Sequence, residues 1–568
     1  AGVFGASLNV LTEAIQPTAS AEIANFYGSY NTHKHSLKFS TGKINDRFEL
    51  SGRFSVIKSD GYRDRGWSNL KSYFLQGAYA YGGTLIKAIL LGGKQHAYLT
   101  YLGLDKATLA NDRRYNPAGE YTDAAGNKRF YDNESDNYQQ DLAQLHWSQQ
   151  WNEFWRTQIA FHYTKGKGYW ENYEKGAYSW IGLPSLGNDP KGEEKQAYYI
   201  HQQGLNNDFW GTTFSANYKK DNIDLLVGGA LNRYQGAHIK DLLWAEKAYT
   251  SYKNNYSYEG LNTKEEASGF AKLTYTLNSK WSLFADMQLR YVNYEAKKHK
   301  VDEASYNFNP KMGVTFNLNP NNSFYLSYAR ATKEPNRSDY KDYAKELKKN
   351  ALAKKPVAEK LNDFELGWRY QSDKVILNVN GYYMGYQDQL IPTGKLNETG
   401  YSIRENVGSS YRSGIEADAT VNLSTKWIWQ PNVAFSKNIT KDYKTEKKKV
   451  ITYWGDTQIS YSPSAVIGNT ISFLPIKNFQ ASLISKYVGS QYIDNTQREE
   501  AKLDAYFVNN LSLQYEWNPK HTFKSVLFSV IGNNILNAKY IPYGSNKYGE
   551  SYIPAAEAHY LAGITLSF

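Results

Sequence analysis

The sequence has no cysteine and only 3 methionines among its 568 residues. The lack of cysteine excludes disulfides and thiolate metal sites, and the scarcity of methionine argues against a copper or other soft-metal site. Long hydrophobic runs are missing as well. The most apolar stretch, at residues 84–93, is TLIKAILLGG, which carries Lys87 and ends in glycines. A membrane helix needs about 20 apolar residues, so a helical membrane protein is excluded.

Aromatic residues are the class that the chain has in abundance. There are 50 tyrosines, 14 tryptophans and 24 phenylalanines, although the mean hydropathy is only −0.66. This mixture suits a closed sheet in lipid, because alternate residues are polar and Tyr and Trp line both interfaces. The net charge is +11. Its lysines and arginines are dispersed except at 345–355 and 444–449, which predicts solvated loops or contacts to an anionic surface and no nucleic-acid partner.

Alternating segments of about ten to fourteen residues recur from Ala21 to the end of the chain. The last of them, HYLAGITLSF at 559–568, places Tyr560, Ile564 and Phe568 on one side of an extended strand. Each segment is long enough to cross a bilayer at a tilt. The clearest examples are 48–57, 72–81, 154–163, 209–218, 223–234, 269–277, 281–294, 323–331, 363–371 and 375–387.

Short and long connections alternate between these segments. The short ones are rich in Asn, Asp, Gly and Lys, which are the residues of tight hairpin turns, and they lie at 43–46, 81–84, 219–222, 277–280, 319–322 and 371–374. The long ones are too long for a compact soluble domain and lie at 102–138, 164–208, 235–266, 332–360 and 437–462. We therefore predict an all-β fold, a transmembrane antiparallel β-barrel of about 22 strands whose lumen must be plugged.

Four stretches resemble the TonB-dependent outer-membrane receptors. Residues 1–13, AGVFGASLNVLTE, are similar to the end of the plug domain, just before the first barrel strand. Residues 325–340, YLSYARATKEPNRSDY, resemble an aromatic-Ser-Arg run leading to a proline. Residues 406–419, NVGSSYRSGIEADA, resemble the late barrel strands, and 531–544, IGNNILNAKYIPYG, the penultimate strand and loop.

The resemblance implies two parts of unequal size. Residues 1–20 would be the C-terminal remnant of the plug domain and its connection, and residues 21–568 would be the barrel with long extracellular loops. The bulk of the plug would then be absent from this chain. Phe568 would be the recognition signal for the barrel assembly machinery, as in the family.

The family's activity is energised import rather than catalysis, and no catalytic motif is found in the sequence. The resemblance implies a Gram-negative outer-membrane receptor that takes up a ferric siderophore, another iron chelate or a similar scarce nutrient. Residues 111–141 and 333–340 resemble ferric-citrate and ferric-siderophore receptors of the Bacteroidetes type. The TonB–ExbB–ExbD complex would act through the missing plug. Lipopolysaccharide, outer-membrane lipid and a surface lipoprotein are further candidate partners, and no cofactor is expected.

Two other functions stay open at this point. A receptor for haem or vitamin B12 would belong to the same family, and His201 and His238, expected in loops, would suit haem capture. A passive, porin-like channel would need a constriction loop in place of a plug. The resemblance of residues 1–13 to a plug terminus speaks against the channel.

The candidate ligand site is an anion-recognising mouth built from long loops. Guanidinium groups match carboxylates with two hydrogen bonds, and aromatic rings stack on flat chelators. The alternative is that each arginine pairs with the acid beside it, at Asp112, Asp339 or Glu405, or contacts lipopolysaccharide. The candidates are Arg113, Arg114, Tyr115, Asn116, Arg337, Tyr340, Arg404, Asn406, His201 and His238.

A second set of residues is expected to face the lumen and hold the plug. Receptors of this family keep the plug in place by polar contacts to the inner wall. The alternative is that lumen charges are simply solvated. The candidates are Arg233, Gln288, Arg290, Glu365, Arg369, Glu416 and Asp418.

Overall fold

The computed structural model describes residues 12–181, 183–247, 257–347, 353–396, 402–447, 450–519, 522–546 and 549–568. Most of the predicted plug remnant, residues 1–11, lies outside the described residues, so the division at residue 20 stays a prediction. Within the described ranges, no helix is long and apolar enough to cross a membrane.

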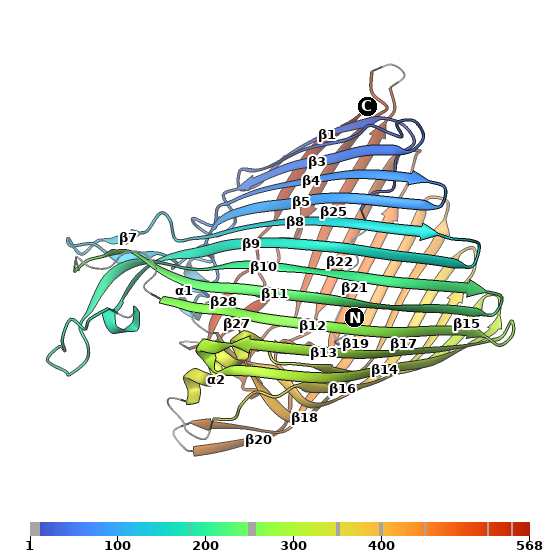
Figure 1. Ribbon diagram of the computed structural model, residues 1–568. Helices are drawn as coiled ribbons and strands as arrows, with labels where there is room; N and C mark the ends of the chain where they lie inside the picture. The colour runs from blue at the N-terminus through green and yellow to red at the C-terminus, as the bar shows by residue number, and fades with distance from the viewer. Residues whose placement is uncertain are drawn as a thin grey trace.

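The described chain forms one large antiparallel sheet that closes on itself (Figure 1). Each strand of the sheet pairs with the next along the chain, except that β20 and β21 both pair with β19, and the first strand pairs with the last. The strands are β1 (Ser20–Gly28), β2 (Thr32–Ser40), β3 (Phe48–Ser59), β4 (Ser68–Tyr81), β5 (Thr84–Tyr98), β8 (Ser135–Gln150), β9 (Trp155–Ala177), β10 (Gln196–Lys220), β11 (Ile223–Ala245), β12 (Ser257–Thr276), β13 (Trp281–Ala296), β14 (Val301–Asn319), β15 (Asn322–Lys333), β16 (Glu359–Gln371), β17 (Val375–Leu396), β18 (Ser402–Ser424), β19 (Trp427–Lys447), β20 (Val450–Gln458), β21 (Ala465–Phe473), β22 (Phe479–Val488), β25 (Tyr506–Trp517), β26 (Ser525–Asn533) and β29 (His559–Ser567).

The barrel is 22-stranded. The sheet contains 23 strands, but the two short strands β20 and β21 pair with successive halves of β19 and together occupy the position of one strand. Closure is made where Glu22 of β1 faces Ser567 of β29, and the Phe568 amide donates to the Ala21 carbonyl at 2.9 Å. A closed barrel leaves no unpaired sheet edge. The predicted strand number and antiparallel topology are therefore confirmed.

Short helices, 3₁₀ turns and small hairpins lie at the end of the barrel that carries the long connections. Figure 1 shows this end opposite the end with the tight turns. The elements are α1 (Lys106–Asn111), α2 (Arg337–Leu347), the 3₁₀ turns η1 (Tyr178–Ile181), η2 (Lys297–His299) and η3 (Glu499–Ala501), and the hairpins of β6 (Glu120–Thr122) with β7 (Lys128–Phe130), β23 (Gln491–Tyr492) with β24 (Lys502–Leu503) and β27 (Tyr543–Ser545) with β28 (Ser551–Ile553).

Alternation of side chains gives the wall an apolar outer face. On β29, Tyr560 and Ile564 are exposed outside, as the sequence predicts, while Leu561 and Gly563 between them are not. Met287 and Leu289 of β13 and Met312 of the neighbouring β14 are 58%, 66% and 53% exposed, and a continuous exposed apolar surface of this kind favours an apolar surrounding. Aromatic pairs border this apolar band. On the side of the tight turns, for example, Trp427 stacks on Phe473 with ring centroids 4.4 Å apart. This is the arrangement of a barrel wall in lipid.

The tight turns are confirmed, but three of the long segments, 164–208, 235–266 and 437–462, are largely strand. In the first of them only residues 178–195 connect two strands; the rest continues β9 and β10, which pair without interruption from Thr164 opposite Phe209 to Ala177 opposite Gln196. The sequence there lacks strong apolar alternation, because these strands extend beyond the apolar band. Backbone hydrogen bonds between the strands, and not burial, hold the extension together.

Candidate functional site

Arg113 and Arg114 hold the loops at the mouth together. The Arg113 Nη2 donates to the carbonyl oxygen of Tyr540 at 3.1 Å. The Arg114 Nε donates to the Tyr62 carbonyl at 2.9 Å and lies 3.7 Å from Asp64 Oδ1. Both guanidinium groups are thus engaged with protein from other segments. Neither pairs side chain to side chain with the neighbouring Asp112, although that acid caps the turn by accepting the Arg114 amide at 3.0 Å.

Asn116 and Tyr115 complete this scaffold. Asn116 is fully buried, and its Nδ2 donates to the Leu99 carbonyl at 3.0 Å. The Tyr115 carbonyl accepts from Arg63 Nη2 at 2.7 Å, and the Tyr115 hydroxyl donates to Glu120. Burial lowers the pKa of Arg63 to about 10, which leaves it charged at pH 7. The structure therefore gives residues 113–116 an anchoring position.

Arg404 and Tyr340 fix α2 in the mouth. Arg404 donates to both carboxylate oxygens of Asp339, from Nε at 3.0 Å and from Nη2 at 2.5 Å. Tyr340 stacks on Tyr294 of β13 with ring centroids 6.0 Å apart. Burial raises the pKa of Tyr340 to about 12. These contacts join α2 to the ends of β13 and β18, so the structure brings Tyr340 and Arg404 into one region.

Asn406 holds the segment before β16 in place. Its Nδ2 donates to the Val357 carbonyl at 3.1 Å and to the Asp388 carbonyl at 2.6 Å, and its Oδ1 accepts from the Val357 amide at 2.9 Å. All the polar atoms of this side chain are used in holding the chain before β16 against β17. Asn406 is therefore a further anchor.

Cationic groups gather around His238 on the inner side of the mouth. Burial, with a smaller effect from the charges of Arg337 and Lys341, lowers the pKa of His238 to about 3. Burial likewise lowers the pKa of His299 to about 4, with Lys341 as the largest charge acting on it. Both imidazoles are neutral at pH 7, and Arg337 and Lys341 supply positive charge beside them. We call Arg337, Lys341, His238 and His299 the cationic mouth cluster.

Arg337 and His238 are both among the candidates from the sequence, but the predicted loop position of the histidines is wrong. His201 and His238 were expected in loops, yet both lie within long strands, β10 and β11. His201 is 3% exposed, and its Nε2 lies 3.4 Å from Glu174 Oε2. The prediction failed because these strands continue above the apolar band. Among the described residues, no group of three or more His, Cys, Asp or Glu side chains is placed to hold a metal ion.

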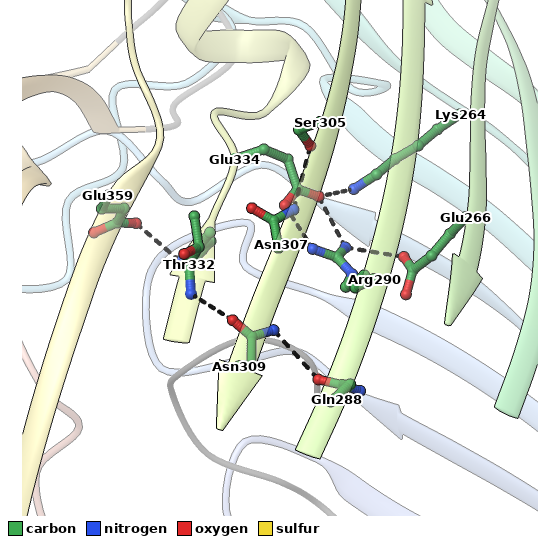
Figure 2. Close-up of polar contacts among 11 residues, drawn as sticks. Lys264, Glu266, Gln288, Arg290, Ser305, Asn307, Asn309, Thr332, Glu334 and Glu359 are labelled. Carbon is green, nitrogen blue, oxygen red and sulfur yellow. Dashed lines mark hydrogen bonds and ion pairs between the residues drawn. The ribbon is translucent and has the colours of Figure 1, made fainter. Parts of the chain in front are cut away.

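Arg290 is the centre of a buried network on the inner wall (Figure 2). Its Nη1 donates to Glu334 Oε2 at 2.8 Å, and its Nη2 donates to Glu266 Oε2 at 2.9 Å. Lys264 adds a second cation, with Nζ 2.5 Å from Glu334 Oε1. Below it, Gln288 accepts from Asn309 Nδ2 at 3.3 Å.

Glu334 was missed in the sequence, although it lies in the 325–340 motif. It follows β15, beyond the outward-facing and exposed Arg330 that marks the end of the apolar band. Burial raises the pKa of Glu334, but hydrogen bonds from Arg290 and Lys264 outweigh burial and lower it to about 2. An acid placed directly after a strand and before Pro335 is the signal that could have identified it.

Four other predicted lumen residues do face inward. Glu365 and Arg369 alternate with Phe364 and Leu366, which are 50% and 62% exposed on the outer face. Strand register then places two further acids inward on β18. Those acids are Glu416 and Asp418, paired opposite Asn380 and Asn378.

Arg233 faces the outside of the barrel, so its predicted place in the lumen is wrong. It shares its face of β11 with Leu231, which is 53% exposed. On the outside, the Arg233 Nη1 lies 3.4 Å from Glu265 Oε1, and the Arg233 Cζ lies 5.9 Å from the centroid of the Trp210 ring. The alternation from Val227 through Leu231 already gave this orientation, because side chains two residues apart share a face.

The segment before β1 lies against the inner wall. Glu13 forms an ion pair with Lys38 of β2 at 2.6 Å, and its carbonyl accepts from Lys87 of β5 at 3.3 Å. The Gln16 amide donates to the buried Glu49 carboxylate at 3.1 Å. The chain therefore enters β1 from inside the lumen.

Comparison with known proteins gives one family and a consistent fold. A sequence model described as TonB dependent receptor-like, beta-barrel, matches residues 91–535. No curated protein matches the sequence. Among solved structures, the ferric citrate transporter FecA in the unliganded form is 14% identical with a TM-score of 0.73, and the alignment covers 98% of this chain and 80% of that one.

Two further solved structures have a similar fold. The ferric-catecholate import receptor Fiu from E. coli K12 is 15% identical, with a TM-score of 0.68 and coverage of 97% of this chain and 82% of that one. The siderophore receptor PiuA from Acinetobacter baumannii is 12% identical, with a TM-score of 0.71 and coverage of 98% and 82%. At such identities the likeness shows the fold and leaves the cargo to be argued from the site.

Proposed function

The chain belongs to the TonB-dependent receptor family, and from this we propose that it imports an anionic iron chelate across the outer membrane. The family consists of transport receptors and not enzymes, and it resides in that membrane. The cationic mouth cluster is the observation that carries the proposal. Arg337 and Lys341 meet there with two neutral histidines, on the inner side of the end that carries the long connections.

The chemistry of the cluster favours a ligand with several carboxylates or catecholates. The cations Arg337 and Lys341 lower the pKa of His238, and Lys341, Lys298 and Lys345 lower that of His299, whereas one acid, Asp342, acts in the opposite direction at His299; positive charge is thus in excess, and an anionic ligand would balance it. Tyr340 and Tyr294 lie next to it, but both are buried and support the cluster from behind. Relatives of the same fold are described as ferric-catecholate and ferric citrate receptors, which supports an iron chelate as the cargo.

Import also needs a gate, because a barrel of this size is wider than its cargo. We expect a plug, continuing from the segment that runs along the inner wall at Glu13 and Gln16, to close the lumen. The TonB–ExbB–ExbD complex would pull on that plug. Lumen residues such as Arg369 and Glu416 would contact it, and a surface lipoprotein could assist capture from outside.

Binding measurements test the capture site. Replacing Lys341 with Gln should weaken binding of ferric citrate or of a ferric catecholate about tenfold, as expected for one charge-assisted contact. Quenching of the intrinsic tryptophan fluorescence reports the binding. Lys128→Gln is the matched control, because Lys128 lies at the same end of the barrel but pairs with Glu120 in an outer hairpin. Equal affinities of the Lys341 variant and the wild type for both chelates would contradict the capture site.

Transport measurements test the mode of passage. Uptake of the iron chelate should disappear when TonB is deleted, and liposomes that carry the full chain should not swell in uncharged sugars. Size-dependent swelling without TonB would indicate a passive, porin-like channel. Growth on a panel of iron sources, haem and vitamin B12 separates the iron chelates from the other cargoes of this family.

A further inference from the structure

Two histidines lie one residue apart near the start of β2. His33 and His35 belong to the sequence THKHS at 32–36, and β2 begins at Thr32, directly after the turn that joins it to β1. Side chains two residues apart on a strand point to the same side of the sheet. The two imidazole rings therefore meet, with centroids 5.7 Å apart and an angle of 47° between their planes.

The pair lies on the outer face of the wall, just beyond the apolar band. Leu37, the next residue on the same face of β2, is 44% exposed, and its partners Ile23 of β1 and Phe54 of β3 are 38% and 45% exposed. His33 lies next to the turn and is paired with the exposed Lys58 of β3. Neither imidazole is buried, so an ion from the medium can reach both rings.

Hydrogen bonds fix the tautomer of both rings. The His33 Nδ1 lies 3.1 Å from the carbonyl oxygen of Asn31, and the His35 Nδ1 lies 2.7 Å from Asn25 Oδ1. Both oxygens are acceptors, so each Nδ1 carries the proton and donates it. The Nε2 atom of each ring then carries a lone pair. Metal-binding histidines have this arrangement, because their second ring nitrogen usually donates to an oxygen that orients the ring.

The neighbouring strand β1 holds the two rings from one side. Tyr27 of β1 is paired with His33, and its ring centroid lies 6.2 Å from that of His33 and 5.5 Å from that of His35. Asn25, which accepts the hydrogen bond from His35, is paired with that histidine. These contacts restrict the rotamers of the imidazoles before any ligand arrives, and a pre-organised pair loses less conformational entropy on binding.

The separation of the rings suits one metal ion bound by both. An imidazole nitrogen binds Zn²⁺ at about 2.0 Å, so two imidazoles on one tetrahedral ion have ring centroids about 5 Å apart. The observed separation of 5.7 Å requires only a small side-chain rotation to reach that value. Imidazole suits Cu²⁺, Ni²⁺ and Zn²⁺, and the affinity of a given site is highest for Cu²⁺. The lack of cysteine argues only against sites that need thiolate ligands.

We propose that His33 and His35 bind one divalent transition-metal ion, Cu²⁺, Ni²⁺ or Zn²⁺, through their Nε2 atoms, with water completing the coordination. A site with two protein ligands binds more weakly than the three- and four-ligand sites of metalloenzymes. Lys58, paired with His33, adds a positive charge that lowers the affinity for a cation. This site is on the outer face, whereas the proposed cargo site is inside the mouth. Failure of either leaves the other standing.

Titration of the full-length protein, without a histidine tag, tests the site with Cu²⁺ as the probe. Calorimetry should find that His33→Asn and His35→Asn each weaken the tightest site at least about tenfold, because each removes one of two linked ligands. His559→Asn is the matched control. Its Nδ1 lies 2.8 Å from the Glu557 carbonyl oxygen, as in the pair, but its ring packs on Tyr30. This control should bind Cu²⁺ like the wild type.

Two further measurements locate the ion. Electron paramagnetic resonance with one equivalent of Cu²⁺ should show coupling to two imidazole nitrogens in the wild type and to one in His33→Asn and in His35→Asn. Lys58→Gln should strengthen binding about two- to fivefold, as expected for the loss of one exposed charge nearby. Weaker binding in Lys58→Gln would place the ion elsewhere and contradict the proposal.

Equal Cu²⁺ affinity of the wild type and the two single histidine variants would overturn the proposal, as would equal weakening by His559→Asn. A wild-type spectrum with coupling to fewer than two imidazole nitrogens would do the same. The gel mobility of the folded barrel before and after heating confirms that each variant is folded.

Discussion

Arg404 and Asp339 form a two-pronged ion pair, with Nε 3.0 Å from Oδ1 and Nη2 2.5 Å from Oδ2. Arg404 lies on β18, and Asp339 lies in α2, so the pair fastens the helix to the barrel wall. Asp339 is 6% exposed. A buried carboxylate without its partner is strongly destabilising, and the loss of one partner of such a pair costs about 3–5 kcal/mol.

We therefore expect Arg404→Gln to release α2. The amides of residues 337–347 should exchange with solvent faster by two orders of magnitude or more, as about 3 kcal/mol of local stability implies. Hydrogen exchange read by mass spectrometry measures this. The double variant Asp339→Asn/Arg404→Gln should recover part of the protection, because its neutral pair buries no charge. Unchanged exchange in the single variant would show that α2 is held by other contacts.

Glu334 should make the same region sensitive to acid. Its pKa lies near 2 in the fold against an ordinary value of 4.5. The carboxylate contributes stability that is fully present above pH 4.5 and is lost as the pH falls from about 4.5 to 2. The shift corresponds to about 3 kcal/mol. Protection of α2 in the wild type should exceed that in Glu334→Gln at pH 6, and the two should converge near pH 2.

Comparing both proteins at each pH removes the intrinsic pH dependence of amide exchange. A variant of Glu303, which pairs with Lys355 and is 41% exposed, is a suitable control because an exposed pair contributes little. A constant difference between wild type and Glu334→Gln across this pH range would contradict the assigned pKa.

The alternation of side chains predicts most of the fold from the sequence. Phe364 and Leu366 point to the lipid side while Glu365 points inward, and the Asn- and Gly-rich turns fix where each strand reverses. Both signals are local, so one sequence suffices. Arg233 was misassigned although the same alternation, counted from Leu231, places it outside.

The site could be predicted only in part, because its contacts join distant segments. Arg113 reaches the carbonyl of Tyr540, 427 residues further along the chain. No local pattern shows that contact, since it depends on where loops from different strands meet after the barrel closes. An arginine in a loop looks the same in the sequence whether it binds a ligand or a carbonyl group.

Glu134 should make the stability of the fold depend on pH in the opposite direction to Glu334. It lies just before β8, is 4% exposed, and burial raises its pKa to about 7 although it accepts hydrogen bonds from Asn172 and the Tyr173 amide. An acid whose pKa is raised by folding binds its proton more tightly in the fold. Stability is therefore highest below pH 4.5 and falls as the pH rises from about 4.5 to 7.

We expect Glu134→Gln to remove this pH dependence. At pH 8 the variant should protect the amides of residues 171–175 better than the wild type, and at pH 4.5 the two should be alike. Glu194→Gln is the control, because Glu194 lies on the surface in the same part of the barrel. Weaker protection in Glu134→Gln at pH 8 would show that the hydrogen bonds from residues 172 and 173 outweigh the cost of burying the charge.

The segment that enters β1 can be followed with a single thiol, because the chain has no cysteine of its own. Ala14 is exposed, and the segment is held by the pair of Glu13 with Lys38 at 2.6 Å. In a protein carrying Ala14→Cys, we expect Lys38→Gln to speed labelling by a maleimide up to about fivefold, since a partly exposed ion pair contributes at most about 1 kcal/mol. Lys43→Gln, in the turn after β2, should leave the rate unchanged. Equal rates with and without Lys38 would mean that the other contacts of the segment, such as those of Gln16 with Glu49 and of the Glu13 carbonyl with Lys87, keep it on the wall without this ion pair.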